Sequence, residues 1–188
     1  LFDKYHSRVP FVKELMNNTS KDSQIQGYIT TLLGRKCRFN SWEVNEYNPG
    51  ILTPAMTKAE AESESLSKQA EEVKKRNEYK LELKEITEEE VEKEIEKLRP
   101  RIRRAFTYKA LNKLIQGSAA DMTKKAMLDL YEEKIIPHIQ IHDELDISVE
   151  KGSNQHKKII EIMEKAVKLN VPNKVDYESG ENWGDIYD

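Results

Sequence analysis

Residues 137–149 read Pro-His-Ile-Gln-Ile-His-Asp-Glu-Leu-Asp-Ile-Ser-Val, and this stretch decides how the chain folds. Apolar residues alternate with polar ones on both sides of the tripeptide His142-Asp143-Glu144, which is the period of half-buried strands. The stretch therefore predicts two short antiparallel strands joined by a tight turn. Such turns favour Asn-Gly or Asp-Gly, whereas this one is expected to carry two adjacent carboxylates.

Two neighbouring carboxylates on a hairpin favour the binding of a cation. Proteins hold Mg²⁺ with one or two carboxylates, and water and phosphate oxygens complete its coordination shell. Asp143 and Glu144 are therefore candidate ligands of Mg²⁺. The alternative is an acidic hairpin tip that only faces water.

A helix is predicted upstream, over residues 104–133. A second face of this helix carries Tyr108, Asn112 and Gln116, which are four residues apart and form a line. The small residues 117–120, Gly-Ser-Ala-Ala, would let another backbone or a nucleic-acid groove approach closely. The alternative is that the polar line only faces water. The residues expected to face the core recur at three- and four-residue steps: Leu111, Leu114, Ile115, Ala119, Met122, Ala126, Met127 and Leu130.

Helix and hairpin together resemble the palm of family A DNA polymerases. Residues 111–121, Leu-Asn-Lys-Leu-Ile-Gln-Gly-Ser-Ala-Ala-Asp, are similar to that family's Asn-x-x-x-Gln-Gly-(Ser/Thr)-Ala-Ala-Asp helix. Residues 141–145, Ile-His-Asp-Glu-Leu, are similar to its His-Asp-Glu hairpin. Residues 27–36, Gly-Tyr-Ile-Thr-Thr-Leu-Leu-Gly-Arg-Lys, resemble the segment after the fingers, and residues 180–184, Gly-Glu-Asn-Trp-Gly, resemble the closing Asn-Trp.

The resemblance implies a role for each matching residue. Asp143 matches the palm aspartate that ligates the catalytic metals, and Glu144 matches its neighbour in the metal site. His142 matches a residue beside the primer terminus. Amide side chains that match Asn112 and Gln116 touch the minor groove, where every correct base pair offers purine N3 or pyrimidine O2 acceptors. The candidate DNA-binding residues are therefore His142, Asn112, Gln116, Tyr108 and Arg35.

The implied reaction is attack of a primer 3′-hydroxyl on the α-phosphate of a deoxynucleoside triphosphate. Two Mg²⁺ ions would stabilise the entering and leaving oxygens. The family's other metal-binding aspartate and its fingers helix have no counterpart in this chain. We therefore expect no activity in isolation, and partners that include primer–template DNA, the triphosphate and a missing N-terminal polymerase part, in cis or in trans. Truncation of a longer polymerase and a naturally split enzyme are both consistent with this expectation.

The predicted fold class is α+β, a palm fragment with a small antiparallel sheet packed on helices and a helical-hairpin insertion. Residues 1–52 are expected to hold the helix and strands that follow the fingers. Residues 53–99 would form the charged insertion. Residues 100–188 would form the palm, with the minor-groove helix, the hairpin and a C-terminal helix and strand.

The insertion contains two capping-box signatures, Thr57 with Glu60 and Thr87 with Glu90, which predict two helix starts. Its 14 acidic and 10 basic residues between positions 58 and 99 are typical of a solvated helical face. Binding of a processivity factor at residues 58–99 is the alternative.

Three weaker expectations concern the ends of the chain. A helix over residues 5–21 should turn its apolar side chains inward, a helix is predicted over residues 154–169, and a final strand over residues 174–177. The inward residues of the first helix would be Phe11, Val12, Leu15 and Met16.

Composition constrains the setting. The net charge is −3, with 37% hydrophobic and 35% charged residues, so a DNA-binding face must come from local clusters of basic side chains. A single Cys37 excludes an intramolecular disulfide and fits a reducing cytoplasm, in a bacterial cell or a phage-infected host. No apolar stretch approaches membrane-spanning length, so no membrane partner is expected. The basic residues expected to cluster are Arg35, Lys36, Arg38, Arg101, Arg103 and Arg104.

Two rival functions remain at this point. An HD-type metal phosphohydrolase would use His142 and Asp143, but those enzymes carry the pair on a helix among further metal-binding histidines. A non-enzymatic DNA-binding or interaction subunit built around the insertion is the second.

Overall fold

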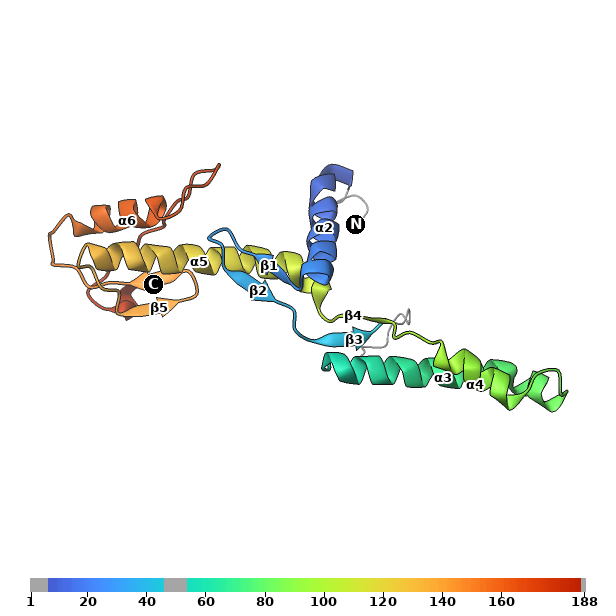
Figure 1. The fold of residues 1–188 in the computed structure, drawn as a ribbon. Helices are drawn as coiled ribbons and strands as arrows, with labels where there is room; N and C mark the ends of the chain where they lie inside the picture. The colour runs from blue at the N-terminus through green and yellow to red at the C-terminus, as the bar shows by residue number, and fades with distance from the viewer. Residues whose placement is uncertain (1–6, 46–53, 187–188) are drawn as a thin grey trace. The chain divides into compact units, whose positions relative to one another are not determined.

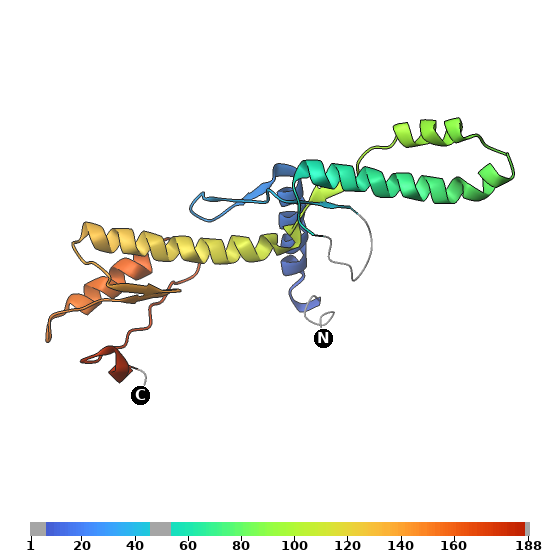
Figure 2. The same cartoon turned by 90° about the horizontal axis from the view of Figure 1, so that it is seen from below.

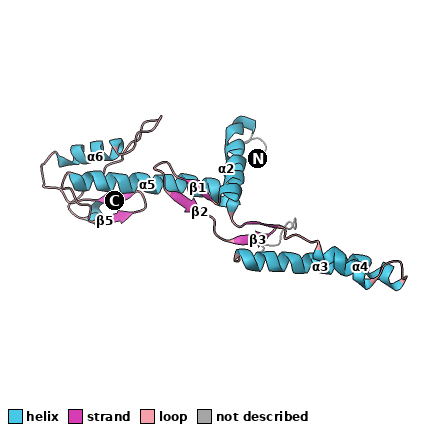
Figure 3. Cartoon of the chain, in the orientation of Figure 1, coloured by secondary structure: helices cyan, strands magenta, loops and turns pink. Residues whose placement is uncertain are grey.

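The computed structural model describes residues 7–45 and 54–186, and its architecture is α+β, as the sequence predicts. Figure 3 shows that helices dominate and that the strands are short. The helices are α2 (Pro10–Gln26), α3 (Lys58–Glu82), α4 (Glu88–Glu96), α5 (Ala110–Glu132) and α6 (Gln155–Lys165), with the 3-10 helices η1 (Thr107–Lys109) and η2 (Trp183–Ile186). The strands are β1 (Tyr28–Thr30), β2 (Lys36–Arg38), β3 (Trp42–Val44), β4 (Ile102–Arg104), β5 (Ile139–Ile141) and β6 (Glu144–Asp146).

The strands form three two-stranded sheets, β1 with β2, β3 with β4 and β5 with β6. The chain divides into two compact units, Leu1–Ile29 with Lys36–Leu111, and Thr30–Arg35 with Asn112–Asp188. Among the described residues no helix is long and apolar enough to cross a membrane.

Arg104 joins the helical and extended parts of the first unit. Its Nη1 donates to the Phe39 carbonyl at 2.9 Å, and its Nε donates to the Gln24 carbonyl at 3.2 Å. Its guanidinium lies 4.5 Å from the centre of the Trp42 ring, within cation–π range. Gly27, with φ 78°, ends α2 in the left-handed conformation, and a Cβ there would lie only 2.7 Å from the Arg104 Cζ.

Both predicted capping boxes are confirmed at the starts of α3 and α4, where Thr57 and Glu60, and Thr87 and Glu90, exchange hydrogen bonds. These bonds lower the pKa of the Glu60 and Glu90 carboxyls, because they favour the ionised form. The two helices lie side by side, and Glu94 of α4 accepts hydrogen bonds from side chains of α3 (Figure 1).

The buried face of α3 is more polar than its apolar residues suggest. It repeats every four residues and consists of Ala61, Ser65, Gln69, Val73 and Asn77. Ser65 Oγ accepts from the Arg101 amide at 2.8 Å, and Gln69 Nε2 donates to the Arg99 carbonyl at 3.1 Å. The helix therefore holds the extended chain that leads into β4 through hydrogen bonds to its backbone.

The expected inward face of the first helix is wrong. Phe11 is 64% exposed and Leu15 44%, while the buried residues of α2 are Thr19 and Ser23. The reason is that α2 packs through its C-terminal half, where Gln24 Nε2 donates to Thr107 Oγ1 at 2.7 Å. The expected start near residue 5 lies outside the described residues.

The core of the second unit forms between the C-terminal half of α5, the β5–β6 hairpin and α6, which Figures 1 and 2 show side by side. Of the predicted core stripe of α5, Ile115 (59% exposed) and Ala119 are instead exposed. They lie away from the face that the Thr30–Arg35 turn covers. The buried core residues are Leu130, Ile135 and Ile159, with Leu145, Ile147, Ile162 and Met163 packed against them.

The final strand expected over residues 174–177 is wrong, because the described chain forms no strand there. Side chains of α6 hold this segment instead. Lys174 Nζ lies 3.2 Å from the Glu164 carboxylate, and the Tyr177 ring stacks on His156 with centroids 5.1 Å apart.

The C-terminus of α5 positions the hairpin that follows. Lys134 has φ 63°, its amide donates to the Tyr131 carbonyl, and the Ile135 amide donates to the Leu130 carbonyl at 2.9 Å. This is a Schellman motif, in which the apolar contact between Ile135 and Leu130 continues into the core. Lysine occupies the left-handed position that glycine usually takes.

Replacing Lys134 by glycine should raise the free energy of unfolding by about 0.5–1 kcal/mol, because glycine adopts this conformation without a Cβ clash. Urea unfolding followed by circular dichroism measures the change. The matched control is Lys124→Gly within α5, which should lower the free energy of unfolding by about 1 kcal/mol. If both variants changed the free energy of unfolding in the same direction, the backbone strain assigned to Lys134 would be contradicted.

Candidate functional site

The acidic hairpin is built on a two-residue turn. Ile141 pairs with Glu144 across the strands, which leaves His142 and Asp143 as the turn residues. His142 has φ 52°, and a positive φ at the first central residue matches the twist of a tight hairpin. Glu144 thus begins β6, so the expectation of two carboxylates within the turn is wrong by one residue. The Gln140 side-chain amide donates to the carbonyl of His142, two residues further along the chain.

The hairpin is anchored at its base and open at its tip. Leu145 and Ile147 pack against the core of the second unit, whereas Asp143 and Glu144 are exposed. The His138 amide donates to the Asp146 carbonyl at 2.8 Å and extends the pairing. Two adjacent carboxylates on a fixed base therefore face solvent.

Carboxylate oxygens are the donors that Mg²⁺ prefers, so Asp143 and Glu144 fit part of a magnesium site. Among the described residues no group of three or more His, Cys, Asp or Glu side chains is arranged to hold a metal ion. The hairpin therefore supplies two donors, and the other ligands of a complete shell must come from water, substrate or another polypeptide segment. The His142–Asp143 pair lies in a turn and not on a helix, which removes support for an HD-type phosphohydrolase.

The structure confirms part of the polar line predicted on the helix before the hairpin. Asn112 and Gln116 are exposed and lie one turn apart on α5. Tyr108 is 64% exposed but belongs to η1, a 3-10 helix that precedes α5. Only Asn112 and Gln116 therefore lie one α-helical turn apart, as the sequence predicts for all three residues.

Arg35 lies in the turn between β1 and β2 and contacts α5 at Gly117 and Asp121, which follow Gln116. Its Nε donates to the Asp121 carboxylate at 2.6 Å, and its Nη2 donates to the Gly117 carbonyl at 2.9 Å. Thr31 Oγ1 donates to the other Asp121 oxygen at 2.5 Å, and the Leu32 amide donates to Ser118 Oγ at 3.0 Å. We call these contacts, made by Thr31, Leu32 and Arg35 to Gly117, Ser118 and Asp121, the turn clamp.

Asp121 is only 6% exposed, yet it is held ionised. Burial opposes ionisation, but hydrogen bonds from Thr31 and Arg35 and the positive charges of Arg35 and Lys124 outweigh it, so the pKa of Asp121 is lowered. Sequence reasoning did not select Asp121 or Thr31, although both lie within the motifs. The available signal was the spacing of Asp121, seven residues after Leu114 on the covered face of the helix.

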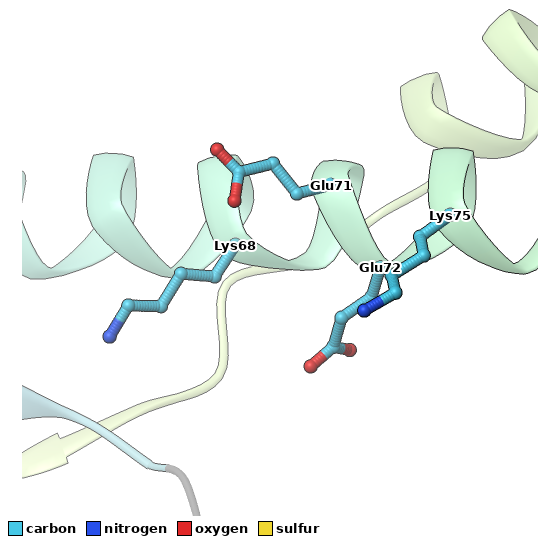
Figure 4. A pocket seen from close by; sticks show the side chains of 4 residues that line it. All are labelled: Lys68, Glu71, Glu72 and Lys75. Carbon is cyan, nitrogen blue, oxygen red and sulfur yellow. The ribbon is translucent and has the colours of Figure 1, made fainter.

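Two of the basic residues predicted to cluster bind other groups of this chain. Arg104 is occupied inside the first unit, and Arg103 Nε donates to the Glu43 carboxylate at 2.6 Å. A different charged hollow lies on α3 and is lined by Lys68, Glu71, Glu72 and Lys75 (Figure 4). It includes none of the predicted site residues, and its two positive and two negative side chains balance, so we assign it no chemistry.

Asp121→Asn should lower the free energy of unfolding by about 2 kcal/mol near neutral pH, because a charged acceptor of two hydrogen bonds becomes neutral. The folded pKa lies below the ordinary value of 3.8, so this stabilisation is complete above that value and is lost as the pH falls through the folded pKa. Urea unfolding at a series of pH values should show the difference between wild type and variant shrinking below about pH 4.

The matched control for that variant is Asp129→Asn, which removes a carboxylate that pairs with Lys125 on the same helix. Asp129 is more exposed than Asp121, so its replacement should cost less. A pH-independent difference for Asp121→Asn would contradict a charged Asp121 in the folded state.

The matching family model and the most similar relatives agree with one another. The model of DNA polymerase family A matches residues 1–185. The DNA-directed DNA polymerase of Pseudomonas phage M6 is 29% identical over 184 residues, which cover 98% of this chain and 19% of that protein. DNA polymerase I of Geobacillus stearothermophilus is 30% identical over 191 residues, which cover 97% of this chain and 16% of that protein. The chain thus spans less than one fifth of either relative's length.

A solved structure has a similar fold. It is described as the POL domain of Pol1 from M. smegmatis in complex with DNA primer-template and dNTP, with a TM-score of 0.59 and 21% identity. The match covers 98% of this chain and 25% of that one. On the extent of the family match, the chain belongs to DNA polymerase family A.

Proposed function

We propose that this chain is the palm part of a DNA-directed DNA polymerase that transfers nucleotides to a primer 3′ end during DNA replication or repair. The observation that carries the proposal is the β5–β6 hairpin, which presents Asp143 and Glu144 to solvent from a base fixed in the core. A polymerase needs carboxylates held rigidly while the DNA beside them moves. Family membership supports the assignment.

Asp143 and Glu144 would hold Mg²⁺ together with ligands from the rest of the polymerase. When bound, two ions supply charge neutralisation at the reacting phosphate oxygens. The chain's own contribution would be two exposed carboxylates in succession, with His142 directly before them and beside the primer terminus.

The DNA contact would be made by α5. Asn112 and Gln116 are exposed amides, and the neighbouring Ala119 and Ala120 are small and exposed, so a duplex can approach closely. Amide donors reach acceptors that every correct base pair presents in the minor groove, so pairing is sensed without sequence preference. Tyr108 completes the set of side chains proposed to touch DNA, and Arg35 belongs to the DNA-binding site through its contacts with α5.

The proposed partners are primer–template DNA, deoxynucleoside triphosphates and the remaining polymerase part, in cis or in trans, in the cytoplasm of a bacterium or an infected host. The proposed parts of the chain are the segment that follows the fingers (residues 1–52), a charged helical insertion (53–99) and the palm (100–188).

The 188-residue chain alone should incorporate no nucleotide in a primer-extension assay, because its described residues offer only part of a metal site. Within the complete polymerase, Asp143→Asn should reduce kcat by at least about 1000-fold, because a charged metal ligand is lost while the fold is kept.

The matched control is Glu150→Gln, an exposed carboxylate beyond β6, which should leave kcat unchanged. Turnover by the isolated chain, or an active Asp143→Asn enzyme, would overturn the proposed role of the hairpin. A non-enzymatic interaction subunit predicts that Asp143→Asn has no effect.

A partner of the insertion can be tested without disturbing β4. Because Ser65 and Gln69 hold residues 99–101, the hairpin should be shortened only beyond Asn77, by replacing residues 78–93 with a short Gly-Ser linker. If a processivity factor binds there, the complete polymerase with that factor should extend fewer nucleotides per binding event, with single-nucleotide incorporation unchanged. Unchanged processivity would exclude a partner at the tip.

A further inference from the structure

The turn clamp acts on the helix directly after the amide that we propose reads the minor groove. Arg35 Nη2 binds the carbonyl of Gly117, the residue that follows Gln116. Ser118 Oγ accepts from the Leu32 amide and donates to the Leu114 carbonyl at 2.7 Å. Contacts therefore fix the helix at three of the five positions that follow Gln116.

A glycine at this point makes the clamp necessary. Gly117 lies inside α5, where glycine is about 1 kcal/mol less favourable than alanine because its backbone has more freedom to lose. The covered face of the helix supplies the missing restraint, since Arg35 holds the Gly117 carbonyl while Asp121 holds Arg35. Gln116 projects from the backbone that is restrained in this way.

The clamp also occupies Arg35. Its side chain is 45% exposed, but its Nε and Nη2 donate to Asp121 and Gly117. The Thr31 hydroxyl, which donates to Asp121, also accepts from the Arg35 amide at 3.1 Å. The side chain and the backbone of Arg35 are thus fixed by the same pair of residues.

We propose that Asp121 and Thr31 are positioning residues that, through Arg35 and Gly117, orient Gln116 for its contact with the DNA minor groove. This inference rests on the proposed function. Arg35 then acts on DNA through the helix and not as a phosphate-binding cation. Loss of the clamp misplaces an amide without removing any group that touches DNA.

Duplexes in which one purine at a time is replaced by its 3-deaza analogue test this directly, because the analogue lacks the minor-groove N3 acceptor. Binding to the 188-residue chain is measured by fluorescence anisotropy. In the wild type, the position that Gln116 contacts should show a loss of affinity of about threefold to tenfold, the value of one hydrogen bond. In Gln116→Ala that position-specific loss should disappear.

Thr31→Val and Asp121→Asn should abolish the same position-specific loss, and Asp129→Asn should keep it. Thr31→Val removes one hydroxyl at nearly constant volume, so it tests the clamp even if Asp121→Asn fails to fold. Arg35→Lys keeps the charge but not the two-pronged geometry. It should behave like Asp121→Asn. Arg35→Gln, which removes the charge, should leave the salt dependence of binding unchanged, whereas a lost phosphate contact would reduce the salt slope by about one.

The outcomes distinguish the minor-groove contact of Gln116 from the positioning role of Asp121 and Thr31. If the loss disappears in Gln116→Ala but persists in Thr31→Val and Asp121→Asn, the positioning role is wrong and the minor-groove contact stands. If Arg35→Lys retains wild-type behaviour, the charge alone suffices and the positioning role is also wrong. If no position in the wild type responds to the analogue, the proposed minor-groove contact itself is wrong.

Discussion

The constraint on which this structure depends is that its extended segments cannot satisfy their own backbone. Each strand in the described part of the chain has three residues and one partner strand, so a ladder of strand hydrogen bonds is too short to hold it. In the first unit, polar side chains on helices supply further hydrogen bonds to the strands and their flanks. Gln24 of α2 binds the backbone of Arg104 in both directions at 2.8 Å, and Ser65 of α3 does the same for Arg101 at 2.8 and 3.2 Å.

The same principle explains why the helices bury polar faces. Ser65 and Gln69 lie on the buried face of α3, and Ser118 and Asp121 interrupt the apolar stripe predicted for α5. A buried hydroxyl or carboxylate is tolerated because each of these groups has a partner in the chain it restrains. The turn that carries Arg35 joins β1 to β2, and the bonds from Thr31 and Arg35 to Asp121 fix it on α5.

Features that depend on neighbouring residues were predicted well from the sequence, and features that depend on contacts between distant segments were not. The two capping boxes and the tight hairpin depend on residues within four positions of one another, and all are present. The apolar faces of α2 and α5 depended on which distant segment covers each helix, and α2 proved exposed at Phe11 because it packs at its other end. The strand expected over residues 174–177 failed for a similar reason, since alternation cannot reveal whether a neighbouring strand exists.

For the candidate site, motif order identified the exposed residues, His142, Asp143, Glu144, Asn112 and Gln116. It did not reveal Asp121 and Thr31, because their pairing joins segments 90 residues apart. Recognition by family thus identifies exposed groups of the candidate site more readily than the buried groups beside them.

The contact between Gly27 and Arg104 has an evolutionary consequence. No side chain fits at position 27 while the guanidinium occupies the space beside it, and a shorter residue at 104 would abandon the Gln24 and Phe39 carbonyls and the Trp42 ring. A side chain at position 27 would displace the guanidinium and would also adopt the left-handed conformation at a steric cost, so selection should hold the glycine more strictly than the arginine.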